Sequence, residues 1–214
     1  MTADLFPDTL APRETLQPGA LLLRAFALDD APALLADVAG VIAAAPFRQM
    51  QTPGGQTMSV AMSSCGECGW VSDRRGYRYS PTDPHTGAPW PAMPPRLADL
   101  ARRAAAEAGF PGFAPDACLI NRYLPGCRMG LHQDRDEADL SQPIVSVSLG
   151  LPATFLFGGP TRGGSPLRLP LVHGDVVVWG GPARLHFHGV APLAAGDHPA
   201  TGGCRINLTF RRAT

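Results

Sequence analysis

The sequence predicts a mainly β chain with flanking helices (α+β), in which short strands form a sandwich or barrel. The main observation is a change of pattern near residue 116, where Ala-rich stretches give way to short alternating or β-branched segments separated by Gly and Pro turns. The second observation is the length of the chain, because 214 residues are enough for one sizeable hydrophobic core but barely enough for two full domains. We therefore expect a single domain over residues 1–214.

Two helices are expected in the first half of the chain. Residues 29–45 are rich in Ala and Leu and begin with two aspartates, which can cap a helix. Residues 96–108 are rich in Arg and Ala, and Gly109 follows them as it often follows a helix. Between the two helices, residues 46–95 contain many Gly, Pro, Ser and aromatic residues. We predict a loop-rich stretch there.

The strands are expected from residue 116 onward. Each is a run that alternates apolar and polar residues or is rich in β-branched residues, and Gly- and Pro-rich turns such as 158–160 and 163–166 separate them. The predicted strands are 117–123, 144–151, 153–157, 167–172, 174–179, 185–190 and 205–211.

Three residues of metal-ligand type occur in a suggestive order. His132 and Asp134 are two apart, so in an extended chain they project to the same side. Further on, His186 and His188 share a face; Gly189 favours His188 because it lets the backbone approach closely, but the spacing leaves His186 open. Two histidines and a carboxylate are the protein ligands of non-haem Fe(II) oxygenases. Oxidative chemistry is therefore the leading hypothesis.

A polar strand face lies near the C-terminus. Residues 205–211 alternate strictly, so that Arg205, Asn207, Thr209 and Arg211 share one face. Arg suits carboxylate binding, because its planar fork pairs with both oxygens and stays charged. The two guanidinium groups are about 20 Å apart on an extended strand, too far to reach one small carboxylate without strand twist or a ligand with two acidic ends. An edge strand that faces water is the alternative.

Taken together, these motifs resemble the AlkB family of 2-oxoglutarate- and Fe(II)-dependent dioxygenases, and its bacterial members in particular. The resemblance extends over nearly the whole chain. Its motifs are Phe47-Arg48-Gln49-Met50, Thr57-Met58-Ser59-Val60-Ala61-Met62, Trp90-Pro91-Ala92-Met93-Pro94, Asn121-Arg122-Tyr123-Leu124-Pro125-Gly126, His132-Gln133-Asp134-Arg135-Asp136-Glu137, His188 and Arg205-x-Asn207-x-Thr209-x-Arg211.

The resemblance implies a fold and an activity. The fold is a double-stranded β-helix (jelly roll) over residues 116–212, with a nucleotide-recognition lid within 46–95. The activity is direct repair of DNA, with RNA as a second candidate, by oxidative demethylation of N-alkylated bases such as 1-methyladenine and 3-methylcytosine. Fe(II) is the metal, 2-oxoglutarate and O2 are co-substrates, and formaldehyde is released.

The resemblance also assigns residues. The far carboxylate of 2-oxoglutarate falls to Arg205 and the metal-bound end to Arg211, a division that removes the difficulty of their spacing. The implied metal ligands are His132, Asp134 and His188; the 2-oxoglutarate site is Asn121, Arg122, Tyr123, Arg205, Asn207, Thr209 and Arg211; the substrate contacts are Trp70, Tyr77, Arg78, Tyr79, Asp136 and Arg162.

The lid segment has the composition that nucleic-acid recognition needs. Its aromatic residues alternate with arginines, and aromatic rings can stack on a base while Arg neutralises phosphate. An enzyme that attacks a base methyl in a duplex must extrude that base, so it needs a stacking slot. By resemblance Trp70 stacks on the base, with His132 on the opposite wall. A carboxylate at Asp136 favours bases that carry a positive charge.

Composition limits the other possibilities. The formal net charge is zero, which argues against a broad non-specific nucleic-acid binder, so DNA contact must be a local patch. The N-terminus has no basic and apolar leader, and no run of 18 apolar residues occurs, so we expect a cytoplasmic protein without membrane contact. A monomer is a separate expectation. Five cysteines suit a reducing compartment. Cys65 and Cys68 form a C-x-x-C pair that we interpret as free thiols in a loop.

Three alternatives use the same residues. A related jelly-roll oxygenase that acts on a small molecule or a protein would keep the triad but would not need the aromatic lid. A cupin-type binding module could hold iron without turnover. A zinc hydrolase that uses His132, Asp134 and His188 would be indifferent to O2.

Overall fold

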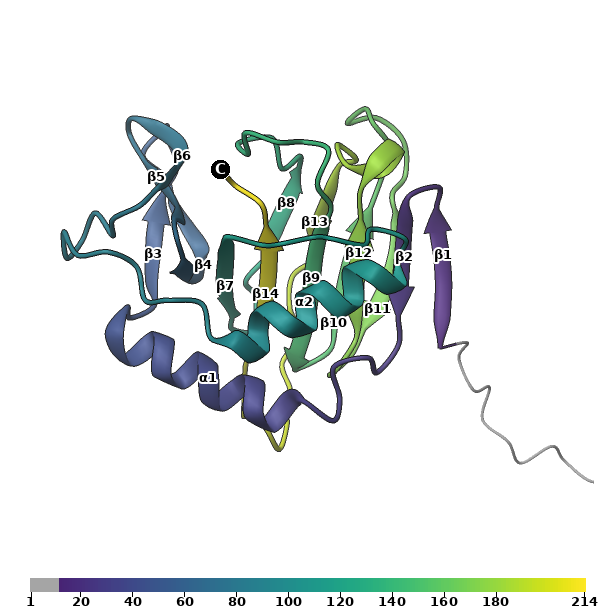
Figure 1. The fold of residues 1–214 in the computed structure, drawn as a ribbon, viewed down its shortest axis with the longest axis horizontal. Helices are drawn as coiled ribbons and strands as arrows, with labels where there is room; N and C mark the ends of the chain where they lie inside the picture. The colour runs from purple at the N-terminus through teal and green to yellow at the C-terminus, as the bar shows by residue number, and fades with distance from the viewer. Residues whose placement is uncertain (1–11) are drawn as a thin grey trace, which may run out of the picture.

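The computed structural model describes residues 12–214, and their core is two antiparallel sheets packed face to face (Figure 1). In the eight-stranded sheet the strand order is β1-β2-β12-β9-β14-β7-β4-β3. Its strands are β1 (Arg13–Gln17), β2 (Ala20–Leu23), β12 (Val176–Trp179), β9 (Ile144–Gly150), β14 (Arg205–Arg211), β7 (Ala117–Tyr123), β4 (Thr57–Gly66) and β3 (Arg48–Gln51).

The second sheet has four strands in the order β11-β10-β13-β8. Its strands are β11 (Leu167–Leu171), β10 (Ala153–Phe157), β13 (His188–Val190) and β8 (Met129–His132). Side chains from the inner faces of both sheets, among them Val177 and Phe155, share one hydrophobic cluster. The expected jelly-roll core with flanking helices is confirmed.

Two helices cover the outer face of the large sheet (Figure 1). They are α1 (Ala31–Ala44) and α2 (Pro95–Glu107), close to the predicted bounds. The N-cap of α1 is Asp30, but its side chain makes no capping hydrogen bond. After α2, Gly109 takes the positive φ of 86° that commonly ends a helix. Within residues 12–214 we find no helix with the length and apolar character that a membrane crossing requires.

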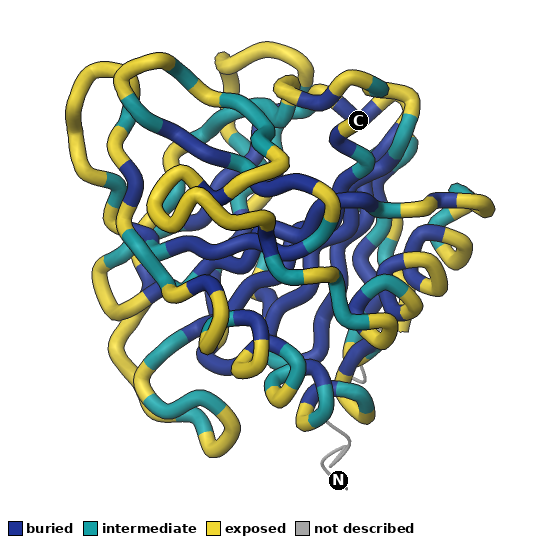
Figure 2. Tube along the Cα trace, turned by 60° about the vertical axis from the view of Figure 1, so that its left-hand side comes forward, coloured by how far each residue is buried: buried dark blue, intermediate teal, exposed yellow. Residues whose placement is uncertain are grey.

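The alternation of β14 separates two environments. Ile206, Leu208 and Phe210 pack beneath the helices. The polar residues of the strand, from Arg205 to Arg211, face the space between the two sheets, where the cavities lie. β14 is also a central strand, paired with β7 and β9, so its polar face is buried rather than exposed at an edge. Figure 2 shows the buried central strands and the exposed loops around them.

The prediction that residues 46–95 are loop-rich misses four strands. β3 and β4 lie in this stretch and extend the large sheet, while β5 (Gly69–Asp73) and β6 (Gly76–Ser80) form a separate hairpin. β4 ends in small residues, two serines, a cysteine and a glycine, that are mostly buried against β7. Such residues are not typical of strands, so the pattern concealed this one. Cys65 lies in β4 rather than in a loop, and both it and Cys68 are buried free thiols.

The end of β4 gives a first testable prediction. Gly66 has a φ of 121°, and a Cβ there would overlap the carbonyl oxygen of Asp116. We expect Gly66→Ala to lower the free energy of unfolding by at least about 2 kcal/mol, since backbone strain adds to the overlap. Gly76→Ala is the control, because Gly76 has a similar φ of 111° but open space around it. It should cost about 1 kcal/mol in a denaturant titration. Equal losses would show that the overlap contributes nothing.

Candidate active site

The three predicted metal ligands lie together at the edge where β8 and β13 pair. His132 and His188 are direct register partners across these strands. Asp134 follows β8 and lies between them, with one carboxylate oxygen 3.4 Å from His132 Nε2 and the other 3.7 Å from His188 Nε2. The ligand atoms of all three lie within 4.8 Å of one another. His186 instead packs its ring against Phe157, so the geometry favours His188 over His186.

Both imidazoles are oriented for ligation through Nε2. His132 Nδ1 lies 2.9 Å from the carbonyl oxygen of Gly130, and His188 Nδ1 lies 3.0 Å from that of His186. A carbonyl can only accept, so each Nδ1 carries a proton and each Nε2 is the nitrogen that faces Asp134. Burial opposes the charge of His132, but the nearby Asp134 raises the pKa of this ring, so a metal ion would displace the proton on its Nε2. Burial, aided by the nearby His132, lowers the pKa of His188 to about 4, which keeps this ring neutral.

Asp134 is held as a carboxylate by a buried arginine. Burial alone would raise its pKa, but the charge of Arg211 and the two histidines lower it well below the usual range. Arg211 donates from Nε to an Asp134 oxygen at 2.9 Å and lies 3.3 Å from Glu137. Two imidazoles and one carboxylate are the donor set that a non-haem Fe(II) site requires. The residues therefore fit Fe(II).

Two adjoining cavities meet at this triad. The outer cavity has a volume of about 310 Å³ and opens beside the β5–β6 hairpin, and the inner one is narrower and lies between the sheets. His132 and Arg211 line both, Asp134 lines the outer cavity and His188 the inner one. A metal held by the triad would therefore separate two binding spaces.

The inner cavity contains a buried cation without an anion. Arg205 is 1% exposed, and burial lowers its pKa. It donates from Nη2 to the hydroxyl of Ser148 at 3.0 Å and lies over the ring of Tyr123, while its Nε and Nη1 have no partner within residues 12–214. A buried charge without a partner is costly, so this arrangement is suited to an incoming carboxylate. The residues fit a dicarboxylate such as 2-oxoglutarate.

Neutral polar groups surround this arginine. Asn207 donates to the hydroxyl of Ser146 at 2.8 Å and accepts from Asn121 at 3.2 Å and from Thr209 at 3.0 Å. The Asn121 oxygen has no partner in the described chain. These groups line the inner cavity and leave part of their hydrogen-bonding capacity free for a ligand.

Arg122 requires a correction. Because β7 alternates, Asn121 and Tyr123 face the inner cavity while Arg122 points to the opposite face of the sheet. There its guanidinium lies 4.7 Å from the centre of the Phe47 ring. The prediction that Arg122 helps to hold 2-oxoglutarate is therefore wrong.

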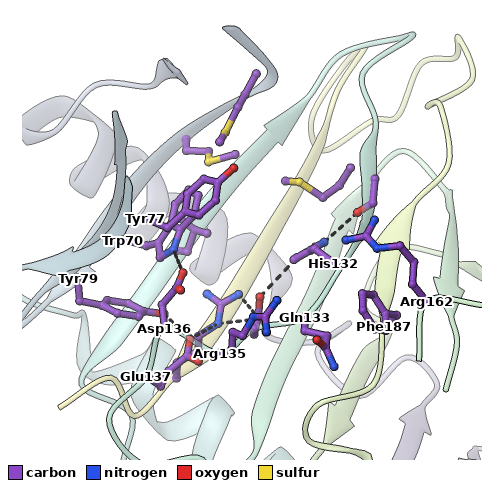
Figure 3. Close-up of a pocket in the computed structure, with 17 residues that line it drawn as sticks. Trp70, Tyr77, Tyr79, His132, Gln133, Arg135, Asp136, Glu137, Arg162 and Phe187 are labelled. Carbon is purple, nitrogen blue, oxygen red and sulfur yellow. Dashed lines mark hydrogen bonds and ion pairs between the residues drawn. The ribbon is translucent and has the colours of Figure 1, made fainter. Parts of the chain in front are cut away.

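The predicted substrate contacts line the outer cavity, with one exception (Figure 3). In this view Trp70 and Tyr77 lie on one side, Arg162 lies on the other, and His132 lies between them. The Trp70 and Tyr77 rings stack with their centres 5.5 Å apart and an angle of 14°. Tyr79 and Asp136 complete the predicted set in this cavity.

Arg78 is the exception. It lies between Tyr77 and Tyr79 on β6, so it faces the other side of the hairpin, where it forms an ion pair with Asp73 at 2.8 Å. The strict alternation of a strand separates it from the two tyrosines that point to the cavity.

Several residues at this site carry no role that the sequence patterns indicate. Glu137 and Arg184 form a buried ion pair at 3.0 Å, and Arg184 also donates to the backbone carbonyl oxygen of Asp134 at 2.7 Å. Ser146 and Ser148 contact the polar face of β14. The serines could have been found, because they are the polar positions in the alternating strand β9. Arg184 carries no such signal, because its partners are distant in the sequence.

Comparisons with known proteins agree with this geometry. The model of the 2OG-Fe(II) oxygenase superfamily matches residues 19–211. The chain is 59% identical over 210 residues to the alpha-ketoglutarate-dependent dioxygenase AlkB of Escherichia coli strain K12, which covers 98% of this chain and 97% of that protein. It is 47% identical over 211 residues to the AlkB homolog of Caulobacter vibrioides strain NA1000 / CB15N, covering 97% and 90%.

A solved structure gives the same result at the level of the fold. The structure of OsALKBH1 matches with a TM-score of 0.83 and 30% sequence identity, covering 94% of this chain and 100% of that one. With the His-Asp-His cluster between the sheets, these similarities establish the chemistry as that of a dioxygenase that uses Fe(II) and 2-oxoglutarate. The chain belongs to the 2OG-Fe(II) oxygenase superfamily and, within it, to the AlkB family.

Proposed function

We propose that this enzyme removes methyl groups oxidatively from N-alkylated bases, with 1-methyladenine and 3-methylcytosine in DNA as the main substrates and RNA as a second candidate. The observation that carries the proposal is the outer cavity, which offers aromatic walls and a carboxylate next to the metal ligands. Two relatives support it through their names, a DNA N(6)-methyladenine demethylase of Arabidopsis thaliana and a nucleic acid dioxygenase of Mus musculus.

The walls of the outer cavity suit a flat, cationic ring. Trp70 and His132 both line it, so a base could lie between an indole and an imidazole. Asp136 lines it too, and a carboxylate stabilises a methylated base that carries a positive charge. The exposed Arg135 and Arg162 add positive charge where a phosphate backbone would pass. These features support a base that is extruded from its stack.

Each group at the triad has a separable role. His132, Asp134 and His188 would hold Fe(II), and Arg205 would hold the far carboxylate of 2-oxoglutarate. When bound, Fe(II) with 2-oxoglutarate and O2 supplies the oxidising chemistry that hydroxylates the N-methyl carbon, giving succinate and CO2, and the hydroxylated methyl leaves as formaldehyde. The protein orients both ligands and excludes water from the space between the sheets.

We also propose the organisation around this site. The β5–β6 hairpin, within residues 46–95, acts as the nucleotide-recognition lid, and residues 116–212 supply the jelly-roll core of a single domain. The enzyme works as a monomer in the cytoplasm, and its five free cysteines support a reducing compartment.

The test uses oligonucleotides with different base charges. Purified enzyme with Fe(II), 2-oxoglutarate and O2 is given single-stranded DNA that carries either 1-methyladenine, a cation, or 1-methylguanine, which is neutral. Mass spectrometry follows the loss of the methyl group, and succinate is measured in parallel. We expect demethylation of the cationic base with matching succinate. Succinate without base repair would leave an oxygenase of small molecules or proteins.

The residue responsible for this preference is expected to be Asp136. Replacing it with Asn keeps the shape but removes the charge, so kcat/KM for 1-methyladenine should fall about 10- to 100-fold, since a hydrogen bond to a charged group contributes about 1.5–3 kcal/mol. The value for 1-methylguanine should change much less. Asp99→Asn on α2, an exposed carboxylate remote from the cavities, is the matched control. Equal losses for both bases would contradict a role in reading charge.

A further inference from the structure

Two hydrogen bonds connect the β5–β6 hairpin to the segment that carries the metal ligands. Trp70 and Tyr79 are register partners on the two strands of the hairpin, so their side chains share one face. Trp70 Nε1 donates to Asp136 at 2.8 Å, and the Tyr79 hydroxyl donates to Glu137 at 2.7 Å. Trp70 and Tyr79, which are neighbours on the hairpin, therefore bind the consecutive carboxylates of Asp136 and Glu137, two and three residues after Asp134.

Glu137 is the inner member of this pair and is almost fully buried. Its side chain is 2% exposed. One oxygen accepts from Arg184 Nη2 at 3.0 Å, and the other accepts from the Tyr79 hydroxyl and lies 3.3 Å from Arg211 Nε. Arg211 in turn donates to Asp134. Its guanidinium is therefore shared between a predicted metal ligand and a carboxylate that contacts the lid.

Sharing one cation between two carboxylates creates a competition. The Tyr79 hydroxyl donates one of the hydrogen bonds that the buried Glu137 carboxylate accepts. Burial keeps the pKa of Tyr79 well above its ordinary value, so the hydroxyl remains a donor. Without that donor, the buried Glu137 oxygen has only Arg211 Nε, at 3.3 Å, as a partner in the described chain, and it attracts Arg211 more strongly. The bond from Arg211 that orients Asp134 is then weakened.

We propose that Tyr79 and Glu137 are positioning residues that transmit the position of the lid hairpin to the metal ligand Asp134 through Arg211. With the hairpin docked, Tyr79 holds Glu137 and Arg211 stays with Asp134. With the hairpin lifted, Arg211 shifts toward Glu137 and Asp134 loses its orientation. The lid therefore covers the base and also controls the orientation of the metal ligand Asp134. Only the identity of the covered ligand, a base, rests on the proposed function.

Tyr79→Phe tests the proposal, because it removes only the hydroxyl. Its first readout needs no substrate: the affinity of the enzyme for Mn(II), measured from the electron paramagnetic resonance signal of free Mn(II). Loss of an outer partner of a metal ligand typically costs 10- to 100-fold in affinity, and we expect about tenfold here. Ser80→Ala is the matched control on the same strand, since its hydroxyl bonds only to the nearby Thr82 within the described chain and should leave the affinity unchanged.

A double-mutant cycle separates transmission through Glu137 from a general effect on folding. In a Glu137→Gln background the neutral amide competes less for Arg211, so adding Tyr79→Phe should change Mn(II) affinity by less than twofold. Thermal unfolding of each variant shows whether it is folded. Additive effects, or a wild-type Mn(II) affinity in Tyr79→Phe, would overturn the proposal.

A second readout tests whether the connection from Tyr79 to Asp134 affects catalysis. With a saturating methylated oligonucleotide, the ratio of formaldehyde to succinate should fall several-fold in Tyr79→Phe, because a poorly oriented centre consumes 2-oxoglutarate without demethylating the base. If no variant demethylates the base, the proposed function fails. The Mn(II) affinities still test whether Tyr79 and Glu137 position Asp134. If Tyr79→Phe changes neither the ratio of formaldehyde to succinate nor the Mn(II) affinity, Tyr79 does not position Asp134 and the proposal is wrong.

Discussion

Replacing Asp134 with Ala is expected to abolish Fe(II) binding and succinate formation, with a loss of at least roughly a thousandfold, because the site loses the only anion among its three ligands. The change also leaves Arg211 buried beside Glu137 alone. Metal content after reconstitution and succinate per enzyme are the measurements. Unfolding must be followed in parallel, since removing one partner of a buried ion pair costs about 3–5 kcal/mol.

The histidines provide a matched pair for the same prediction. His188→Ala should lose metal and activity as Asp134→Ala does, because His188 Nε2 faces the carboxylate. His186→Ala should keep both, because only the backbone carbonyl of His186 contacts the site. The reverse result, with metal retained in His188→Ala and lost in His186→Ala, would contradict the proposed triad.

The second large effect is expected at Arg205. Replacing it with Met fills most of the same volume but removes the cation, so KM for 2-oxoglutarate should rise about 30- to 5000-fold, since loss of one partner of a buried charge pair costs about 2–5 kcal/mol. Arg205 has no anionic partner in the described chain. Without 2-oxoglutarate, Arg205→Met should therefore unfold at the same or a higher temperature than wild type.

This combination distinguishes a binding residue from a structural one. Ser148→Ala, which removes the hydroxyl that accepts from Arg205, is the milder companion and should raise KM by about tenfold or less. A lower unfolding temperature in Arg205→Met with an unchanged KM would show that the arginine only supports the sheet.

Much of the fold follows from local patterns. Strands such as β7, β10 and β14 were predicted with their observed bounds because each alternates or is rich in apolar residues between clear turns. β8 was missed, because it has only four residues and one of them is Gly130. β4 was missed because small polar residues are buried at its end.

The sequence predicts a site residue correctly where strand alternation alone determines which way its side chain points. It cannot do so where the answer depends on how two distant strands pair. The alternation of β14 separates its polar face from Ile206, Leu208 and Phe210, as observed. The same rule applied to β7 would have placed Arg122 away from Asn121. Spacing could not choose between His186 and His188, because the choice depends on the pairing of β13 with β8.

Contacts between distant segments lay beyond sequence reasoning. The Tyr79 hydroxyl reaches Glu137 across 58 positions of the chain, and Arg184 reaches Glu137 across 47. No local pattern reports such distances, and the acidic pair at Asp136 and Glu137 looks like ordinary surface sequence. Its two members turn out to differ, because Glu137 is buried and Asp136 lies in the exposed outer cavity.

One metal site is expected to separate a co-substrate space from a base space. A crystal structure grown without O2 in the presence of Mn(II), 2-oxoglutarate and an oligonucleotide with one 1-methyladenine would show this arrangement. We expect anomalous density for the metal among His132, Asp134 and His188, 2-oxoglutarate in the inner cavity with a carboxylate on Arg205, and the base in the outer cavity. A metal at His186, or 2-oxoglutarate in the outer cavity away from Arg205, would contradict it.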